Sequence, residues 1–192
     1  MTSKFRLPLL AALLAAAPAW AATLYTLPAA TTALDTNTSV SASFGASSGA
    51  GSVVFTLAGY GSLDGDNYYI DILQVTLNGS EVFSGTWNIG GGGADRVLFN
   101  PNGATVGGIT GQQLSIMLPV ALVAGNNDLV FTYTSPVKFE GIDRAGFQGV
   151  GDEAWGLNAL TVTGISPVPE PASAAMLLAG LGMFGWAASR RR

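Results

Sequence analysis

The 192-residue chain contains no cysteine and no histidine, and only 8 of its residues are Lys or Arg. Without cysteine there can be neither a disulfide nor a thiolate nucleophile. Without histidine there can be no Ser-His-Asp triad and no histidine-ligated zinc. Catalysis is left with carboxylates, hydroxyls, tyrosines and a few cations, so a glycosidase-type pair of carboxylates is the main enzymatic possibility.

The few positive charges are unevenly distributed. Five of them lie in the first six and last three residues, so residues 22–166 hold three cations against eleven carboxylates, a formal charge of −8. A surface this acidic repels nucleic acid and anionic lipid, and it is compatible with divalent cations. This body of about 145 residues is long enough for one domain with one core and too short for two.

Residues 1–22 predict a secretory signal peptide. Two cations within the first six residues precede an apolar stretch at 7–19, and small residues follow at Ala19 and Ala21. These are the two positions that a signal peptidase reads, so cleavage is expected after Ala21 or Ala22. A transmembrane anchor would need a longer apolar run.

The C-terminus combines three different pieces in a fixed order. A linker at 166–171 carries a Pro-Glu-Pro step, 172–189 is uncharged and mostly apolar, and 190–192 is basic. Eighteen residues extend about 27 Å as a helix, just enough to cross a bilayer, and the basic end favours the cytoplasm. The prolines hold the linker extended. The motif consists of Val168, Pro169, Glu170 and Pro171, and the basic stop of Arg190, Arg191 and Arg192.

This ending resembles the PEP-CTERM sorting signal of Gram-negative bacteria. The resemblance implies that a membrane enzyme, an exosortase, recognises and processes the tail after signal peptidase has acted at the N-terminus. The predicted helix at 172–189 is then a transient anchor in the inner membrane, and the product goes to the cell surface or the extracellular space. The resemblance covers the last twenty-five residues and leaves the function of the body open.

The body reads as short strands separated by Gly, Asn, Asp and Ser. Residues 68–77 alternate between two faces, Asn78-Gly79 gives the strongest short hairpin signal, and 81–87 returns as the partner strand. No stretch has convincing helical periodicity. We therefore predict an all-β fold for 23–165, an antiparallel two-sheet sandwich that is jelly-roll-like. Further strands are expected at 52–57, 113–118, 127–133, 137–142 and 155–163, with 23–38 as a first strand or a loosely held arm.

Two acidic clusters are candidates for a calcium site. Asp64, Asp66 and Asn67 offer hard oxygen ligands within one turn, although the later glycine and the twelfth-position Glu of an EF-hand loop are missing. Asp152 and Glu153 precede the last strand and could complete the site if the two loops meet. In jelly rolls the first and last strands commonly pair, which can bring distant loops together. The alternative is that both clusters are ordinary solvated turns.

The body also resembles the β-sandwich domains of many PEP-CTERM proteins. Those domains pair an Asp-x-hydrophobic strand ending in Asn-Gly with a late strand similar to Glu-x-Trp-Gly-Leu-Asp-Asn-Val. Here Asp71 heads the first strand, Asn78-Gly79 closes it, and 153–158 matches the second. The departure is Asn158-Ala159 in place of Asp-Asn, which removes one charged ligand. Lectin-like jelly rolls share this strand pattern, so the resemblance implies glycan binding by analogy.

Three classes of function remain open. A non-enzymatic surface or extracellular-matrix protein, associated with exopolysaccharide or biofilm, needs only a stable domain and the tail. A calcium-dependent carbohydrate-binding module is the alternative, with Tyr68 and Tyr69 as stacking residues, because neighbouring strand residues point to opposite faces and one should be exposed. A glycosidase would need two carboxyls about 5–10 Å apart, and no spacing connects any two of Glu81, Glu140 and Glu153.

Overall fold

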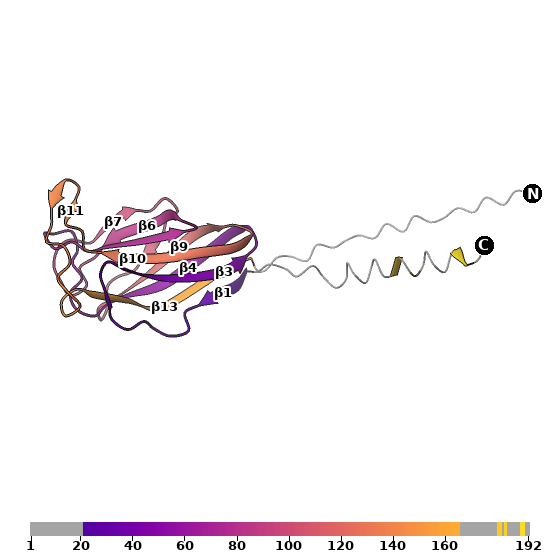
Figure 1. Cartoon of the computed structure of the whole chain (residues 1–192), viewed down its shortest axis with the longest axis horizontal. Helices are drawn as coiled ribbons and strands as arrows, with labels where there is room; N and C mark the ends of the chain where they lie inside the picture. Colours follow the sequence, from indigo (N-terminus) through magenta and orange to yellow (C-terminus); the bar gives the residue numbers. More distant parts are fainter. Residues whose placement is uncertain (1–20, 166–179, 182, 184–188, 191–192) are drawn as a thin grey trace, which may run out of the picture.

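A computed structural model of the chain describes residues 21–165, 180–181, 183 and 189–190. Residues 21–165 form two packed antiparallel sheets, which confirms the all-β two-sheet prediction (Figure 1). The first sheet has the order β1 (Ala21–Thr26), β13 (Ala154–Ile165), β4 (Gly49–Gly59), β9 (Gln113–Leu122) and β8 (Thr105–Val106), with β2 (Leu34–Asp35) also paired to β13. The second has the order β3 (Thr38–Ala46), β10 (Gly125–Thr134), β5 (Ile72–Leu77), β6 (Ser80–Thr86) and β7 (Arg96–Phe99), and β11 (Lys138–Phe139) and β12 (Ile142–Asp143) form a separate hairpin.

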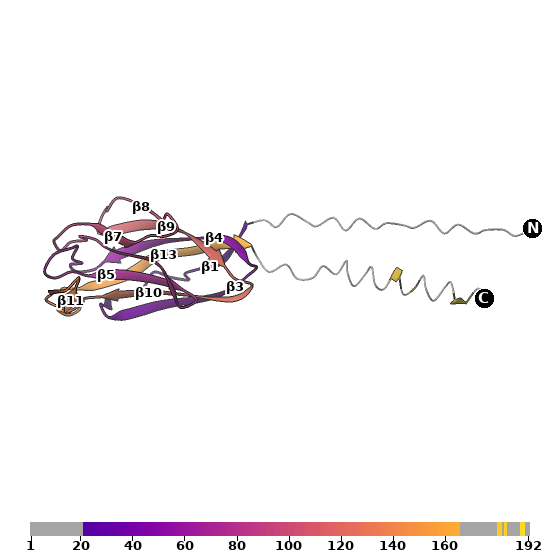
Figure 2. The same ribbon diagram turned by 90° about the horizontal axis from the view of Figure 1, so that it is seen from above.

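Figure 2 shows the two sheets from a second side. The core lies between them and is formed by alternate residues of the strands. In β9 the odd residues from 113 to 117 are exposed and the even ones are buried. The rings of Phe55 in β4 and Phe131 in β10 meet edge to face, 4.9 Å apart and inclined by 68°, and so join the sheets. Each sheet therefore buries one face and leaves the other to solvent.

The first and last strands pair, as expected for this class of sandwich. Ala21 lies opposite Ile165 and Ala22 opposite Gly164, so the chain enters and leaves the domain at one end. The hairpin of β11 and β12 lies at the other end (Figure 1). β1 begins at Ala21, one of the two residues after which signal peptidase is expected to cut.

Several predicted strand boundaries are wrong. β5 begins at Ile72 instead of Tyr68, because residues 64–71 form a closed turn in which the Asp71 N–H donates to the Asp64 carbonyl (3.0 Å). The strand expected at 137–142 is divided between β11 and β12 by a turn at Glu140 and Gly141, whose φ angles are 49° and 80°. β3, β7 and β8 were not predicted at all.

Predictions for the two ends of the chain lie largely outside the described residues. These are the signal peptide before residue 21, the sorting motif at 168–171, most of the helix predicted at 172–189, and Arg191 and Arg192. Within the part of the chain that the structure does describe, no helix has the length and apolar character needed to cross a membrane.

Candidate metal centre

Two loops run side by side at the end of the sandwich away from the chain termini. The N–H of Leu63 donates to the Ile89 carbonyl (3.1 Å), and the N–H of Ile89 donates back (2.9 Å). The glycine run at 90–93 is part of the loop between β6 and β7, and the N–H of Gly65 in the other loop donates to the Gly92 carbonyl (2.7 Å). A Cβ atom on Gly91 would lie 2.8 Å from both carboxylate oxygens of Asp64, so glycine is required there for close approach.

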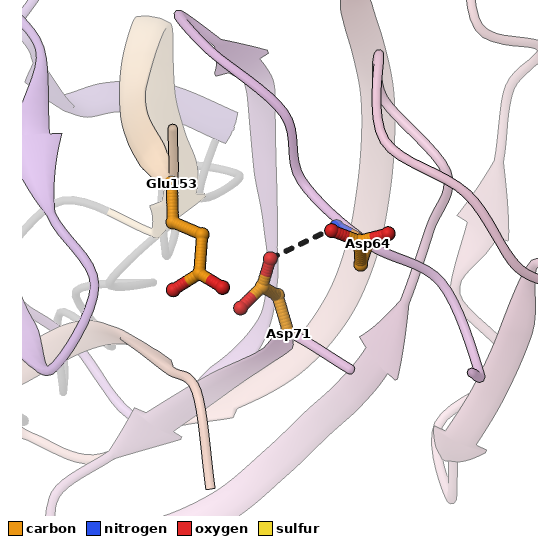
Figure 3. Close-up of side chains that lie close together, drawn as sticks. All are labelled: Asp64, Asp71 and Glu153. Carbon is orange, nitrogen blue, oxygen red and sulfur yellow. Dashed lines mark hydrogen bonds between the residues drawn. The ribbon is translucent and has the colours of Figure 1, made fainter. Parts of the chain in front are cut away.

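Three carboxylates converge behind these loops. Asp64, Asp71 and Glu153 come from the loop after β4, the residue before β5 and the residue before β13, and their side chains lie close together (Figure 3). One oxygen from each lies within 4.8 Å of the others. Their relative exposures are 8%, 0% and 1%, so the cluster is shielded from water.

A single hydroxyl connects two of the carboxylates. Ser135 Oγ lies 2.5 Å from Asp71 Oδ1, 2.9 Å from Glu153 Oε2 and 2.6 Å from Thr36 Oγ1. A serine hydroxyl has one proton to donate, and it can accept one from Thr36. It cannot donate to both carboxylates at once. The cluster therefore needs either a proton on one carboxylate or a cation between them.

Three backbone N–H groups and the Asn67 side-chain amide also donate to carboxylate oxygens of the cluster. Asp71 Oδ2 accepts the N–H of Asp64 (2.9 Å), and Glu153 Oε2 also accepts the N–H of Gln148 (2.9 Å). Asp64 Oδ1 accepts from the Gly92 N–H (2.7 Å) and from Asn67 Nδ2 (2.8 Å). These bonds orient the carboxylates but leave acceptor capacity unused.

Three buried side-chain oxygens of the described residues have no hydrogen-bond partner. They are Glu153 Oε1, the hydroxyl of Tyr133 and Asp35 Oδ1. Burial raises the pKa of Tyr133 well above its ordinary value, and the negative charges of Asp71 and Asp64 raise it further. Burial also raises the pKa of Asp71 to about 7, with the charges of Glu153 and Asp64 adding to the effect against the hydrogen bonds from Ser135 and Asp64. The cluster is thus rich in negative charge and poor in hydrogen-bond donors.

No positively charged side chain neutralises the cluster within the described part of the chain. The two arginines near this end of the domain form ion pairs with other carboxylates. Arg96 pairs with Asp66 (2.9 Å) and Glu140 (2.6 Å), and Arg144 pairs with Asp66 (3.4 Å). Uncompensated buried charge is strongly unfavourable. Because every side-chain atom that could coordinate a metal here is an oxygen, the arrangement fits a hard divalent cation such as Ca²⁺.

The sequence-predicted calcium ligands separate into two groups. Asp64 and Glu153 lie in the buried cluster, and Asn67 touches it through its bond to Asp64. Asp66 instead forms the ion pairs with the two arginines. Asp152 is exposed and accepts from Ser62 Oγ (2.8 Å).

Sequence reasoning did not select Asp71 as a ligand, although a signal was available. In the alternating segment 68–77, Asp71 lies in phase with Leu73, Val75 and Leu77, which are all buried. A charged residue in phase with a core face indicates a buried functional or structural charge. Ser135 and Thr36 gave no such signal, because isolated hydroxyl residues are common in loops.

Tyr68 and Tyr69 are both on the surface, with exposures of 59% and 44%. The expectation that they point to opposite faces of a strand is wrong, because they precede β5 and lie in a turn. Their rings meet at a centroid distance of 5.3 Å and an angle of 83°, so they form an exposed aromatic corner. The Tyr68 carbonyl accepts from the Ala145 N–H (2.9 Å), which connects this corner to the segment after β12.

The three carboxylates considered for a glycosidase are engaged separately. Glu81 accepts a hydrogen bond from Gln74 Nε2 (2.8 Å). The two carboxylate oxygens of Glu140 accept hydrogen bonds from the two terminal guanidinium nitrogens of Arg96, which lowers the pKa of Glu140. Glu153 belongs to the buried cluster. The arrangement therefore supports a cation site better than a hydrolytic pair of carboxylates.

The solved structures similar to this chain include two carbohydrate-binding modules of family 35. One, from Cellvibrio japonicus Abf62, has 13% identity and a TM-score of 0.37, covering 70% of this chain and 74% of its own. The other, from Clostridium thermocellum, has 15% identity and a TM-score of 0.33, covering 74% and 90% respectively. Similarity at this level assigns neither fold nor ligand.

Comparison with curated proteins gives no match. Comparison with protein families matches residues 167–192 to the PEP-CTERM protein-sorting motif. The matched segment contains the Pro-Glu-Pro step, the apolar stretch and the terminal arginines on which the resemblance was based. The chain therefore carries a PEP-CTERM protein-sorting motif at residues 167–192, which confirms the resemblance of its ending.

Proposed function

We propose that this chain is an exported, non-enzymatic β-sandwich of the cell surface or extracellular matrix, stabilised by a buried Ca²⁺ ion. The observation that carries the calcium proposal is the cluster of Asp64, Asp71 and Glu153, in which Glu153 Oε1 is buried without a partner. The sorting motif supports the route. The rest of the proposal joins that route to the chemistry of the cluster.

The route begins with signal peptidase, which removes residues up to Ala21 or Ala22. The apolar stretch at 172–189 then holds the protein in the inner membrane while an exosortase acts near Pro169, Glu170 and Pro171. Processing there leaves an acidic domain whose eleven carboxylates outnumber its three cations. Such a domain is suited to an extracellular environment, where divalent cations are plentiful and can neutralise it.

The ion would hold together three segments that are distant in the sequence. Asp64 belongs to the loop beside the glycine run, Asp71 leads into the second sheet, and Glu153 leads into the first. One ion bound to all three would therefore connect both sheets and the loops at this end. The burial of all three side chains favours a structural ion over a catalytic one, since no substrate could reach it.

A melting experiment tests the ion. Residues 21–165 contain every strand and the whole core of the described structure, so this segment is the folding unit to purify. Relative to EDTA, Ca²⁺ at a hundred times its Kd should add about 2.7 kcal/mol, a rise of roughly 10 °C in Tm for a domain of this size. Glu153→Gln should abolish the response.

The matched control is Asp152→Asn, because Asp152 is the adjacent carboxylate but is exposed and bonded to Ser62. This variant should respond to Ca²⁺ like the parent. Absence of any shift at millimolar Ca²⁺ would contradict the proposal, and so would equal loss of the response in both variants. Mg²⁺ should stabilise less, because it loses its water reluctantly and demands a tighter octahedral site.

Glycan binding is the second candidate, favoured by the exposed right-angle corner of Tyr68 and Tyr69. Flat aromatic faces stack on sugar rings, and two perpendicular faces would hold one ring from the side and from below. The corner leads directly into Asp71, so the proposed ion would help to fix its position. Specific binding would then be lost in EDTA as well as on mutation.

The test is retention of the purified domain on the host's exopolysaccharide. Tyr68→Ala and Tyr69→Ala should each weaken binding by at least about fivefold, a loss of 1 kcal/mol or more, with an unchanged melting temperature. Phe147→Ala is the matched control, since Phe147 is an exposed aromatic (45%) outside the corner. Unaltered retention of both tyrosine variants would reject this site and leave the matrix role.

A further inference from the structure

The four strands at the edges of the two sheets are unequal. β8 has two residues, β7 has four, and β1 has six with a bulge between Thr23 and Tyr25. β3 has nine residues, and its pairing with β10 runs without any register shift from Ala46 to Thr38. β3 is therefore the one long, regular edge among these four.

The outer edge of β3 has unused hydrogen-bonding groups. In the part of the chain that the structure describes, β10 is the only strand paired with β3, and no loop backbone bonds to residues 39–46. Alternate residues of an antiparallel strand direct their N–H and C=O groups away from the neighbour. Such a row is a template for another strand unless charge, proline or a bulge blocks it.

None of these blocking devices is present on β3. Its sequence, TSVSASFGA, contains no charged residue and no proline. Asp35 is the only charged residue between positions 21 and 63, although the body as a whole carries eleven carboxylates. The side of the sandwich formed by β1, β2 and β3 thus contains one charged residue, Asp35 of β2, in an otherwise acidic domain.

The strand is also complementary to itself when reversed about Ala42. An antiparallel pair with Ala42 opposite Ala42 places Val40 opposite Phe44, both of which point toward the core side. On the solvent side it places Ser41 opposite Ser43, so hydroxyl faces hydroxyl, and such cross-strand pairs are favourable. The neighbouring Asp128, which accepts from Ser43 Oγ (2.6 Å), would lie about 16 Å from its counterpart, beyond the screening length in physiological salt.

We propose that two copies of this chain associate through β3, antiparallel and centred on Ala42, to form one continuous sheet across the dimer. The second sheets of the two copies, five strands each, then share a two-fold axis perpendicular to the strands. The association uses backbone groups and involves none of the proposed calcium ligands. It therefore occurs in EDTA as well as in Ca²⁺, which separates its failure from that of the ion site.

Sedimentation of the 21–165 domain over a range of concentrations tests the proposal. The parent should show a monomer–dimer equilibrium, and Ser41→Glu should weaken it by more than about tenfold because two like charges then face the joint. The control is Ser115→Glu, the same change at an exposed site in β9 of the other sheet. A parent that stays monomeric at millimolar concentration, or equal weakening by both variants, would overturn the proposal.

Disulfide trapping tests the register, because the chain has no native cysteine. Ser41→Cys and Ser43→Cys proteins should crosslink when mixed, since directly opposed Cα atoms lie about 4.5–5.5 Å apart. Neither should crosslink alone, because position 41 is diagonal to itself at about 7–8 Å. Crosslinking of the Ser41→Cys protein alone would indicate another pairing and overturn this one.

Discussion

Replacing Trp155 by alanine is expected to lower the free energy of unfolding by about 3–5 kcal/mol. Trp155 is the largest fully buried side chain of the described domain and packs on Tyr133 at a ring distance of 5.5 Å. Its Nε1–H donates to the Asp35 carbonyl (2.9 Å), so the same side chain connects β13 to β2. A domain with a total stability of about 5–15 kcal/mol would lose a large part of it.

The denaturation midpoint in urea measures this effect. Tyr68→Ala is the control, because Tyr68 is an aromatic residue that is largely exposed, and it should change stability by no more than about 0.5 kcal/mol. Trp155→Phe should fall between the two, since it keeps most of the ring but removes one of the two donors to the Asp35 carbonyl, the other being the Thr38 hydroxyl. Equal midpoints for Trp155→Ala and Tyr68→Ala would show that the inner packing contributes little.

The sandwich could be predicted because its central strands carry strong local signals. Asn78 and Gly79 have φ angles of 53° and 78°, as the two-residue hairpin turn requires, and few other residue pairs adopt both. The segments at 113–118 and 127–133 alternate buried and exposed residues with period two in the structure. In these places local propensity and tertiary packing agree.

β3 was missed because its residues have little strand propensity of their own. Serine, alanine and glycine make up most of it, and none favours a pleated strand strongly. Nine consecutive pairings with β10 supply what the sequence lacks. The strand is set by tertiary contacts, and the same small, uncharged residues leave its outer edge open to a second copy.

The candidate site was predicted in outline but not in its membership. Both acidic clusters contribute one carboxylate each, Asp64 and Glu153, because the loops that carry them do meet. Asp66 is held elsewhere by Arg96, the first residue of β7, and by Arg144, which follows β12, and neither was associated with it from the sequence. Spacing along the chain can suggest which residues share a loop, but it cannot show which arginine side chains from other segments lie beside them.

Asp71→Asn is expected to stabilise the domain in EDTA at pH 8 and to destabilise it in saturating Ca²⁺. In EDTA the folded domain holds the Asp71 proton up to a pKa of about 7, against an ordinary value of 3.8. The protonated Asp71 therefore makes its full contribution to the free energy of unfolding below about pH 4. That contribution is lost as pH rises through 7, by about 4 kcal/mol in all. Asparagine never ionises, so the variant escapes this loss and should be the more stable protein at pH 8 in EDTA.

The asparagine can also preserve the local hydrogen bonds. Its Oδ1 can accept the Asp64 N–H, and its Nδ2 can donate to Ser135 Oγ, which then donates its own proton to Glu153. In saturating Ca²⁺ the order should be opposite, because the ion stabilises the ionised Asp71 of the parent and the variant has lost a charged ligand. Urea midpoints of both proteins at pH 4.5 and 8, with EDTA or Ca²⁺, measure this crossover. If the variant were the less stable protein at pH 8 in EDTA, ionised Asp71 would not be an unfavourable charge in the ion-free domain, and the electrostatic need for a cation would disappear.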